Sequence, residues 1–276
     1  DDNPPEISLE ELKSKLYQIK EILTNEHKSL FIDDLDDLIN KVNIFGYHFA
    51  SLDIRQDSRI HSKVFENIFK IAQKSLIKIF PTNYLNLSEE KKIKVLSSIK
   101  RNIPLDHFKD ELAISTLGSI RAMKTIQNAN GEKGSNRYII SNNQSSLNIL
   151  EVFTMFRLSD WESPSVDIIP LFETISDLKV ASMVMESVYR NKLYRDHLSK
   201  RGNKQTIMLG FSDGTKDGGY LMANWSILKA KEALTTISRK FGIKVLFFDG
   251  RGGPPARGGG NTHQFYASMG GFVESD

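Results

Sequence analysis

Residues 167–174 read DIIPLFET, and residues 206–213 read TIMLGFSD. Each stretch is a short apolar run, rich in residues that favour strands, and each ends near a carboxylate: Glu173 in the first and Asp213 in the second. A helical pattern follows each run. Strands that alternate with helices indicate parallel pairing. These two stretches therefore predict an α/β fold with a parallel sheet.

The same alternation extends along most of the chain. Three further strand candidates lie at residues 45–54, 138–141 and 244–248. Helical patterns lie between and after the strands, at residues 60–79, 110–126, 147–156, 176–198 and 220–241. Each strand ends in polar or charged residues, as on the active-site face of a parallel α/β barrel. Open doubly wound sheets bind ligands at the same strand ends, so this feature is shared by the two folds.

The first part of the chain is predicted to be helical and separate from the sheet. Ser8 and Glu11 have the spacing of a capping box, and apolar residues at helical spacing follow them. A second helical pattern covers residues 31–42. We predict an N-terminal helical segment at residues 1–44 and a partial α/β barrel at residues 45–276.

Composition excludes several classes of partner. The 37 Lys and Arg residues and 34 Asp and Glu residues give a net charge of +3, too small to indicate a nucleic acid or an anionic membrane as partner. The chain has no cysteine, which excludes disulfides and thiolate-bound metals and fits a reducing cytosol. No apolar run approaches the roughly 20 residues that cross a bilayer.

Two carboxylates at equivalent strand ends suggest a site for a hard metal ion. Glu173 and Asp213 follow different strands, and parallel strands bring their C-terminal ends to one edge. Carboxylate oxygens suit Mg²⁺ or Mn²⁺, especially when the substrate carries phosphate. The structural alternative is that these carboxylates bind helix N-termini or an arginine instead.

Residues 250–260 read GRGGPPARGGG and form the most distinctive motif. Glycines allow the backbone to approach a ligand, and Arg251 and Arg257 add planar donors suited to phosphate or carboxylate. A P-loop is excluded because no Gly-Lys-Ser/Thr closes the motif. Lys216 and Arg55 are further candidate anion ligands; pairing of Lys216 with Asp217, and of Arg55 with a neighbouring aspartate, is the structural alternative.

Together these motifs resemble phosphoenolpyruvate carboxylases. That family carries Leu-Asp-(Ile/Val)-Arg-Gln, Pro-Leu-Phe-Glu-Thr, Ser-Asp-Ser-Ala-Lys-Asp-Ala-Gly-Tyr with a following Asn-Trp pair, and Gly-Arg-Gly-Gly followed by Arg-Gly-Gly. The matching stretches here are residues 52–56, 170–174, 212–220 with 223–225, and 250–259. Because four motifs occur in the family's order, the probability that they match by chance is very small.

The resemblance implies a fold, a reaction and a set of roles. The fold would be a partial (β/α)8 barrel of the TIM type, and the enzyme a carboxy-lyase that converts phosphoenolpyruvate and bicarbonate to oxaloacetate and inorganic phosphate. Glu173 and Asp213 would hold Mg²⁺ or Mn²⁺. The catalytic residues would be Arg55, Lys216, Arg251 and Arg257. By the same resemblance we expect a cytoplasmic protein that is a homo-oligomer at full length, acting in anaplerotic carbon fixation.

Two departures from the family pattern qualify this interpretation. The family usually has histidine before Gly-Arg-Gly-Gly, where this chain has Asp249; we predict that Asp249 orients a neighbour such as Arg251 or a metal-bound water. The alternative that Asp249 favours is a non-catalytic metal- and phosphate-binding domain. The family is also several times longer, and its N-terminal catalytic histidine motif and C-terminal arginine loop have no match here. We therefore expect an internal fragment that is inactive alone.

Overall fold

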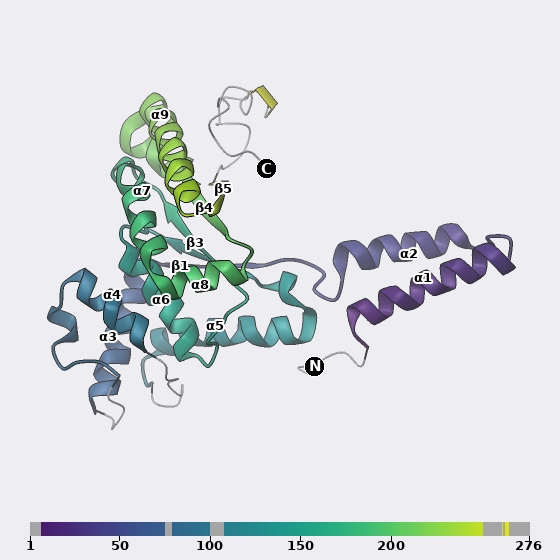
Figure 1. Cartoon of the computed structure of the whole chain (residues 1–276), viewed down its shortest axis with the longest axis horizontal. Helices are drawn as coiled ribbons and strands as arrows, with labels where there is room; N and C mark the ends of the chain where they lie inside the picture. The colour runs from purple at the N-terminus through teal and green to yellow at the C-terminus, as the bar shows by residue number, and fades with distance from the viewer. Residues whose placement is uncertain (1–6, 75–78, 100–107, 251–260, 262, 265–276) are drawn as a thin grey trace. The chain divides into compact units, whose positions relative to one another are not determined.

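The computed structural model of the chain describes all residues except 1–6, 75–78, 100–107, 251–260, 262 and 265–276 (Figure 1). The helices in the described ranges are α1 Leu9–Glu26, α2 Ile32–Phe45, α3 Ser58–Lys74, α4 Glu89–Ser98, α5 Glu111–Asn130, α6 Ser146–Leu158, α7 Ile175–Arg190, α8 Lys192–Lys200 and α9 Phe211–Lys240. The strands are β1 Asp53–Asp57, β2 Arg137–Ser141, β3 Asp167–Phe172, β4 Lys204–Gly210 and β5 Lys244–Gly250. These elements fall into two compact units, residues 1–53 with 121–136, and residues 54–120 with 137–276.

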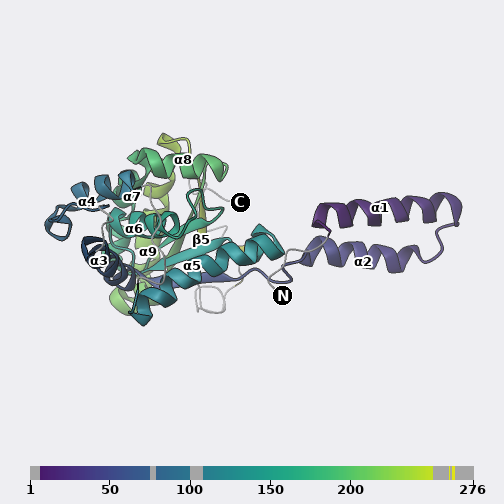
Figure 2. The same cartoon turned by 90° about the horizontal axis from the view of Figure 1, so that it is seen from below.

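The first unit contains a helical hairpin. Helices α1 and α2 pack side by side, as Figures 1 and 2 both show. Ser8 caps α1 as predicted, because its hydroxyl accepts a hydrogen bond from the backbone N–H of Glu11 at 3.1 Å. An ion pair between Lys20 and Asp36, 2.6 Å apart, links the two helices.

The second unit is built on a five-stranded sheet in the order β1-β2-β3-β4-β5. The pairs from β2 to β5 are parallel, as the alternation of strands and helices predicted. Strand β3 is buried along almost its whole length, which a parallel strand covered on both faces requires. On one face of the sheet Ile139, Ile169 and Leu171 form an apolar cluster with the partly buried Met208.

The helices that follow the strands pack against one another in sequence. Helix α3 contacts α6, α6 contacts α7, and α7 contacts α9. Figure 1 shows α6, α7 and α9 together beside the strands. Each of these helices therefore contacts the helix that follows the next strand. Together the four helices form one continuous layer.

The predicted strand at residues 45–54 is wrong for most of its length. Helix α2 continues to Phe45, and Gly46, with a φ of 49°, ends it. A turn follows in which Phe49 also has a positive φ, and the strand itself begins only at Asp53. The apolar side chains that suggested a strand are largely exposed, Phe49 by 77% and Leu52 by 65%.

Three helical regions also differ from the sequence expectations. The pattern at residues 176–198 is two helices, because Asn191 takes an extended conformation and its side chain caps α8. Helix α9 begins at Phe211 rather than at residue 220 and is interrupted at Gly219, whose φ of 78° suits glycine. Helix α4 was not predicted. In the described part of the chain no helix is both long and apolar enough to cross a membrane.

Candidate functional site

The turn after β3 fixes the position of Glu173. Thr174 follows it and begins helix α7 with a capping box: the Thr174 hydroxyl accepts from the Asp177 N–H at 3.1 Å, and the Asp177 carboxylate accepts from the Thr174 N–H at 3.0 Å. The chain therefore turns directly from strand into helix. Glu173 is left at the C-terminal end of the sheet, where the sequence placed it.

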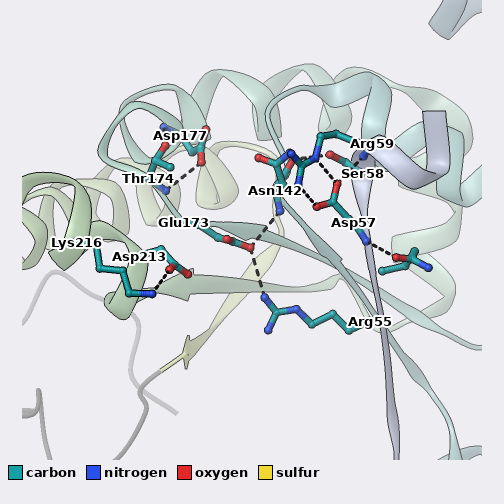
Figure 3. Close-up of polar contacts among 11 residues, drawn as sticks. Arg55, Asp57, Ser58, Arg59, Asn142, Glu173, Thr174, Asp177, Asp213 and Lys216 are labelled. Atoms are coloured by element: carbon teal, nitrogen blue, oxygen red, sulfur yellow. Dashed lines mark hydrogen bonds and ion pairs between the residues drawn. The ribbon is translucent and has the colours of Figure 1, made fainter. Parts of the chain in front are cut away.

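The Glu173 carboxylate links the ends of β2 and β3 to a residue of β1. Its Oε1 atom accepts a hydrogen bond from the backbone N–H of Asn142, which follows β2, at 3.1 Å. The same oxygen lies 3.5 Å from Nη2 of Arg55 in β1, a long contact. Figure 3 shows both groups directed at this carboxylate. The side chain of Glu173 is only 19% exposed, whereas that of Arg55 is 51% exposed, so an exposed guanidinium meets a largely buried carboxylate.

Asp213 and Lys216 lie in the first turns of α9, immediately after β4. Lys216 Nζ is 3.1 Å from Asp213 Oδ1, and both side chains are substantially exposed (Figure 3). The alternative partner Asp217 instead accepts a hydrogen bond from the backbone N–H of Ile175, at the start of α7. Lys216 is therefore directed at the proposed metal ligand rather than at Asp217.

Close packing brings the start of α9 against Glu173. A Cβ atom added to Gly210 would lie 3.1 Å from the Cα of Glu173, and one added to Gly214 would lie 3.4 Å from its carbonyl oxygen. Asp213 lies between these two glycines in the sequence. The fold thus brings the two predicted metal ligands to neighbouring positions at one edge of the sheet (Figure 3).

A second arginine lies at the same edge. Arg59 binds both carboxylate oxygens of Asp57, at 3.0 and 2.7 Å. These hydrogen bonds lower the pKa of Asp57 below its ordinary value. The pairing occupies Asp57, so Arg55 binds Glu173 instead of this neighbouring aspartate. Sequence reasoning did not find Arg59, although its spacing two residues after Asp57 is a local signal for such a pair.

The carboxylates offer a donor set that fits a hard divalent ion. Among the described residues, no group of three or more His, Cys, Asp and Glu side chains is placed to hold a metal. Mg²⁺ is nevertheless commonly bound by one or two carboxylates, with waters and substrate phosphates completing its shell. Glu173 and Asp213 match that pattern. Their contacts with Arg55 and Lys216 are of the kind that the structural alternative expects, so metal binding stays a prediction.

The remaining predicted residues divide into two groups. Arg251 and Arg257 lie outside the described residues. Asp249, near the end of β5, is described, and it forms an ion pair with Lys231 of α9, with an Nζ–Oδ1 distance of 2.8 Å. Sequence reasoning missed Lys231; the available signal was a lysine at a helical position in line with the buried Ile227 and Leu234.

The Asn-Trp pair that follows the Gly219 interruption is at the surface. Trp225 of this pair is 55% exposed. It lines an apolar hollow of about 600 Å³ together with Tyr220, Leu221 and Met222. Helix α9 therefore packs against the sheet through its later turns, where Ile227 and Leu234 are buried.

A comparison with protein families agrees with the motifs. The model of the family described as phosphoenolpyruvate carboxylase matches residues 2–269. The match covers nearly the whole chain, including the helical hairpin, the five strands and every candidate site residue.

Proposed function

Since the chain belongs to the phosphoenolpyruvate carboxylase family, we propose that it forms part of an enzyme that joins bicarbonate to phosphoenolpyruvate, yielding oxaloacetate and inorganic phosphate. The observation that carries this proposal is the cluster at the C-terminal ends of the parallel strands. Two carboxylates, Glu173 and Asp213, are each in contact with a cation, Arg55 and Lys216. Such a cluster can hold a divalent ion and a multiply charged anion together.

We propose that the sheet is part of a (β/α)8 barrel. Its strands follow one another in sequence order without reversal, whereas the strand order of doubly wound sheets reverses at the ligand-binding crevice. The helices after successive strands also contact one another, as in the outer ring of a barrel. The five strands of the described residues cannot close that barrel by themselves, so the complete catalytic site would need further segments.

Glu173 and Asp213 would hold Mg²⁺ or Mn²⁺, which when bound would act as a Lewis acid toward a substrate oxygen. Arg55 and Lys216 would then bind the substrate's negative oxygens. Both can turn toward an anion because each is more than half exposed and attached to its carboxylate partner by a single contact. Arg251 and Arg257 would add donors for the phosphoryl group.

The reaction that membership of the family implies would use this charge arrangement as follows. An oxygen of bicarbonate attacks phosphorus, and the bond from phosphorus to the enol oxygen breaks, which gives carboxyphosphate and the enolate of pyruvate. Cationic groups around the phosphoryl oxygens offset the charge that develops there, the kind of preorganised stabilisation that typically contributes most to catalysis. Exclusion of water protects the labile intermediate. The enolate carbon would then bond to the carboxyl carbon of carboxyphosphate while the bond from that carbon to the phosphate oxygen breaks, which releases inorganic phosphate and gives oxaloacetate.

The alternative of a non-catalytic metal- and phosphate-binding domain rested on Asp249, which stands where the family usually has histidine. Lys231 pairs with that carboxylate, so its charge is balanced within the protein. This charge balance is compatible with phosphate binding in both functions, so the oxaloacetate assay described below discriminates between them. We further propose that the full-length protein is a cytoplasmic homo-oligomer acting in anaplerotic carbon fixation, in keeping with the absence of cysteine from the chain.

Calorimetric titration with Mn²⁺ tests the metal assignment. Asp213→Asn should weaken binding at least tenfold, because it removes one of two anionic ligands. Asp196→Asn alters an exposed aspartate on α8 and serves as the matched control. Equal affinity for Mn²⁺ in the wild type and Asp213→Asn would refute the assignment of Asp213 as a ligand.

A coupled oxaloacetate assay with Mg²⁺ and saturating bicarbonate tests the catalytic proposal. The full-length enzyme should form oxaloacetate, and the 276-residue chain alone should not. Losing one donor to a developing oxyanion typically costs about 10²–10³ in rate, and the isolated chain would lack several. Activity of the 276-residue chain close to that of the full-length enzyme would show that this segment is sufficient and would refute the expectation of inactivity.

A further inference from the structure

A buried ion pair lies between helix α9 and strand β5. Nζ of Lys231 is 2.8 Å from Oδ1 and 3.0 Å from Oδ2 of Asp249. The two side chains are only 3% and 7% exposed. Lys231 Nζ also lies over the ring of Phe247, 5.4 Å from its centroid, which further holds the ammonium group in place.

Stability alone gives no reason for a pair of this kind. Moving two charges out of water costs several kcal/mol per ion, and apolar residues of similar size often stabilise a protein as well or better. Breaking such a pair is destabilising, because one charge then stays buried without a partner. The position of the pair therefore needs an explanation in terms of function.

The pair lies at the C-terminal ends of the strands, the same edge of the sheet as the candidate site. Asp249 is the penultimate residue of β5 and lies opposite Leu209 in the parallel register, while Gly250 lies opposite Gly210. Gly210 is the residue that packs against Glu173. Asp249 is thus on the strand next to the one that leads into Asp213.

A carboxylate at this edge would oppose an anionic substrate. Like charges repel strongly where burial lowers the effective dielectric constant, and phosphoenolpyruvate carries several negative charges. Lys231 balances the charge of Asp249 from inside the protein. It also fixes the end of β5 to α9, the helix whose first turns carry Asp213 and Lys216.

We propose that Lys231 is a positioning residue for substrate binding: it neutralises Asp249 and holds the end of β5, so that a phosphate-bearing anion can bind at the C-terminal ends of the strands. This inference rests on the proposed function. Lys231 would act through Asp249 and the strand end, without contacting the substrate.

Steady-state kinetics of the full-length enzyme can test this role through the direction of the effects. Lys231→Met leaves the Asp249 charge without its lysine, and the KM for phosphoenolpyruvate should rise at least tenfold, a change of about 1.4 kcal/mol in binding. Asp249→Asn leaves the positive charge, so KM should stay the same or fall. The double variant should return KM to within about threefold of wild type, and Lys231→Arg should retain most of the wild-type affinity.

The control is Lys229→Met, which removes an exposed lysine from the same helix. Lys229 pairs with Glu232 at 2.8 Å, and its side chain is 53% exposed, so KM should be unchanged. A purely structural role for the buried pair predicts something different: both single variants would lose thermal stability and shift KM in the same direction. That result, or an unchanged KM in folded Lys231→Met, overturns the proposal.

Two further comparisons cover the cases in which Lys231→Met does not fold or the wild-type enzyme shows no activity. If Lys231→Met fails to fold, Asp249→Asn and Lys231→Arg still carry the prediction, and a KM raised tenfold in Asp249→Asn overturns it. If the wild-type enzyme forms no oxaloacetate, the proposed function fails. The same proteins are then compared by calorimetric titration with inorganic phosphate, where the same order of affinities supports the positioning role and equal affinities refute it.

Discussion

Glu151 provides a prediction whose magnitude follows from the structure. This residue of α6 is 5% exposed, and its Oε2 atom accepts a hydrogen bond from the hydroxyl of Ser62 in α3 at 3.0 Å. Burial raises the pKa of Glu151 from its ordinary value of 4.5 to about 7. Ser62 and the nearby Lys92 oppose that rise, while Glu89 and Glu66 add to it.

The raised pKa makes the protein less stable as pH increases. Between pH 4.5 and about 7 the unfolded chain has lost the Glu151 proton while the folded protein still holds it. The folded state therefore binds more protons in this window, and the free energy of unfolding falls as pH rises. Each pH unit corresponds to about 1.4 kcal/mol, so the total loss attributable to Glu151 is about 3 kcal/mol, complete above pH 7.

Two buried histidines act in the opposite direction in an overlapping window. Burial lowers the pKa of His61 and of His197 from 6.5 to about 4. Both stay neutral in the folded protein while the unfolded chain gains protons below pH 6.5, so their contribution to stability is lost as pH falls. The pH profile of the wild type alone therefore cannot isolate Glu151.

The measurement is the difference between two proteins. Urea unfolding of wild type and Glu151→Gln, followed by far-ultraviolet circular dichroism at pH 5 and pH 8, cancels the groups that the two share. Glutamine keeps an oxygen for Ser62 and removes the titration. The stability of Glu151→Gln relative to wild type should rise by about 2–3 kcal/mol from pH 5 to pH 8, because the lowest part of the window lies below pH 5. Glu90→Gln alters an exposed glutamate on α4 and should show no such rise. An equal difference at both pH values would refute burial of the Glu151 carboxyl as the cause.

Three further predictions concern the site and its supports. Gly210→Ala places a Cβ atom 3.1 Å from Glu173 Cα; calorimetry and denaturation should show weaker Mn²⁺ binding and a loss of about 1–3 kcal/mol in stability, and unchanged values would show that Glu173 can move freely. Asn191→Ala removes the side chain that accepts from Tyr194 N–H at the start of α8 and should cost about 1 kcal/mol in urea unfolding, whereas Asn191→Asp should cost less. His61→Leu should make stability less sensitive to acid between pH 6.5 and 4; a steeper acid loss than in wild type would contradict the assigned direction.

The elements that the sequence predicted well are those whose signals are local. Strand β3 begins and ends where the apolar run does, because a parallel strand buried on both faces is apolar throughout. The capping of α1 by Ser8 depends on residues within one turn of each other. The positions of Glu173 and Asp213 near strand ends could be predicted for the same reason, since Glu173 directly follows β3 and Asp213 comes three residues after the end of β4. The strand predicted at residues 45–54 was wrong because apolar residues in the turn after α2 gave the same local signal.

By itself, then, the sequence determined the α/β class, the family motifs and the placement of carboxylates at strand ends. Only the tertiary structure decided how the charges pair. Glu173 receives the backbone N–H of Asn142, 31 residues away, and Arg55 from a strand 118 residues away. Lys231 meets Asp249 because α9 packs against β5. Such partners depend on strand order and on helix packing between distant segments. No local periodicity encodes those contacts, and they fix which charges at the site are balanced.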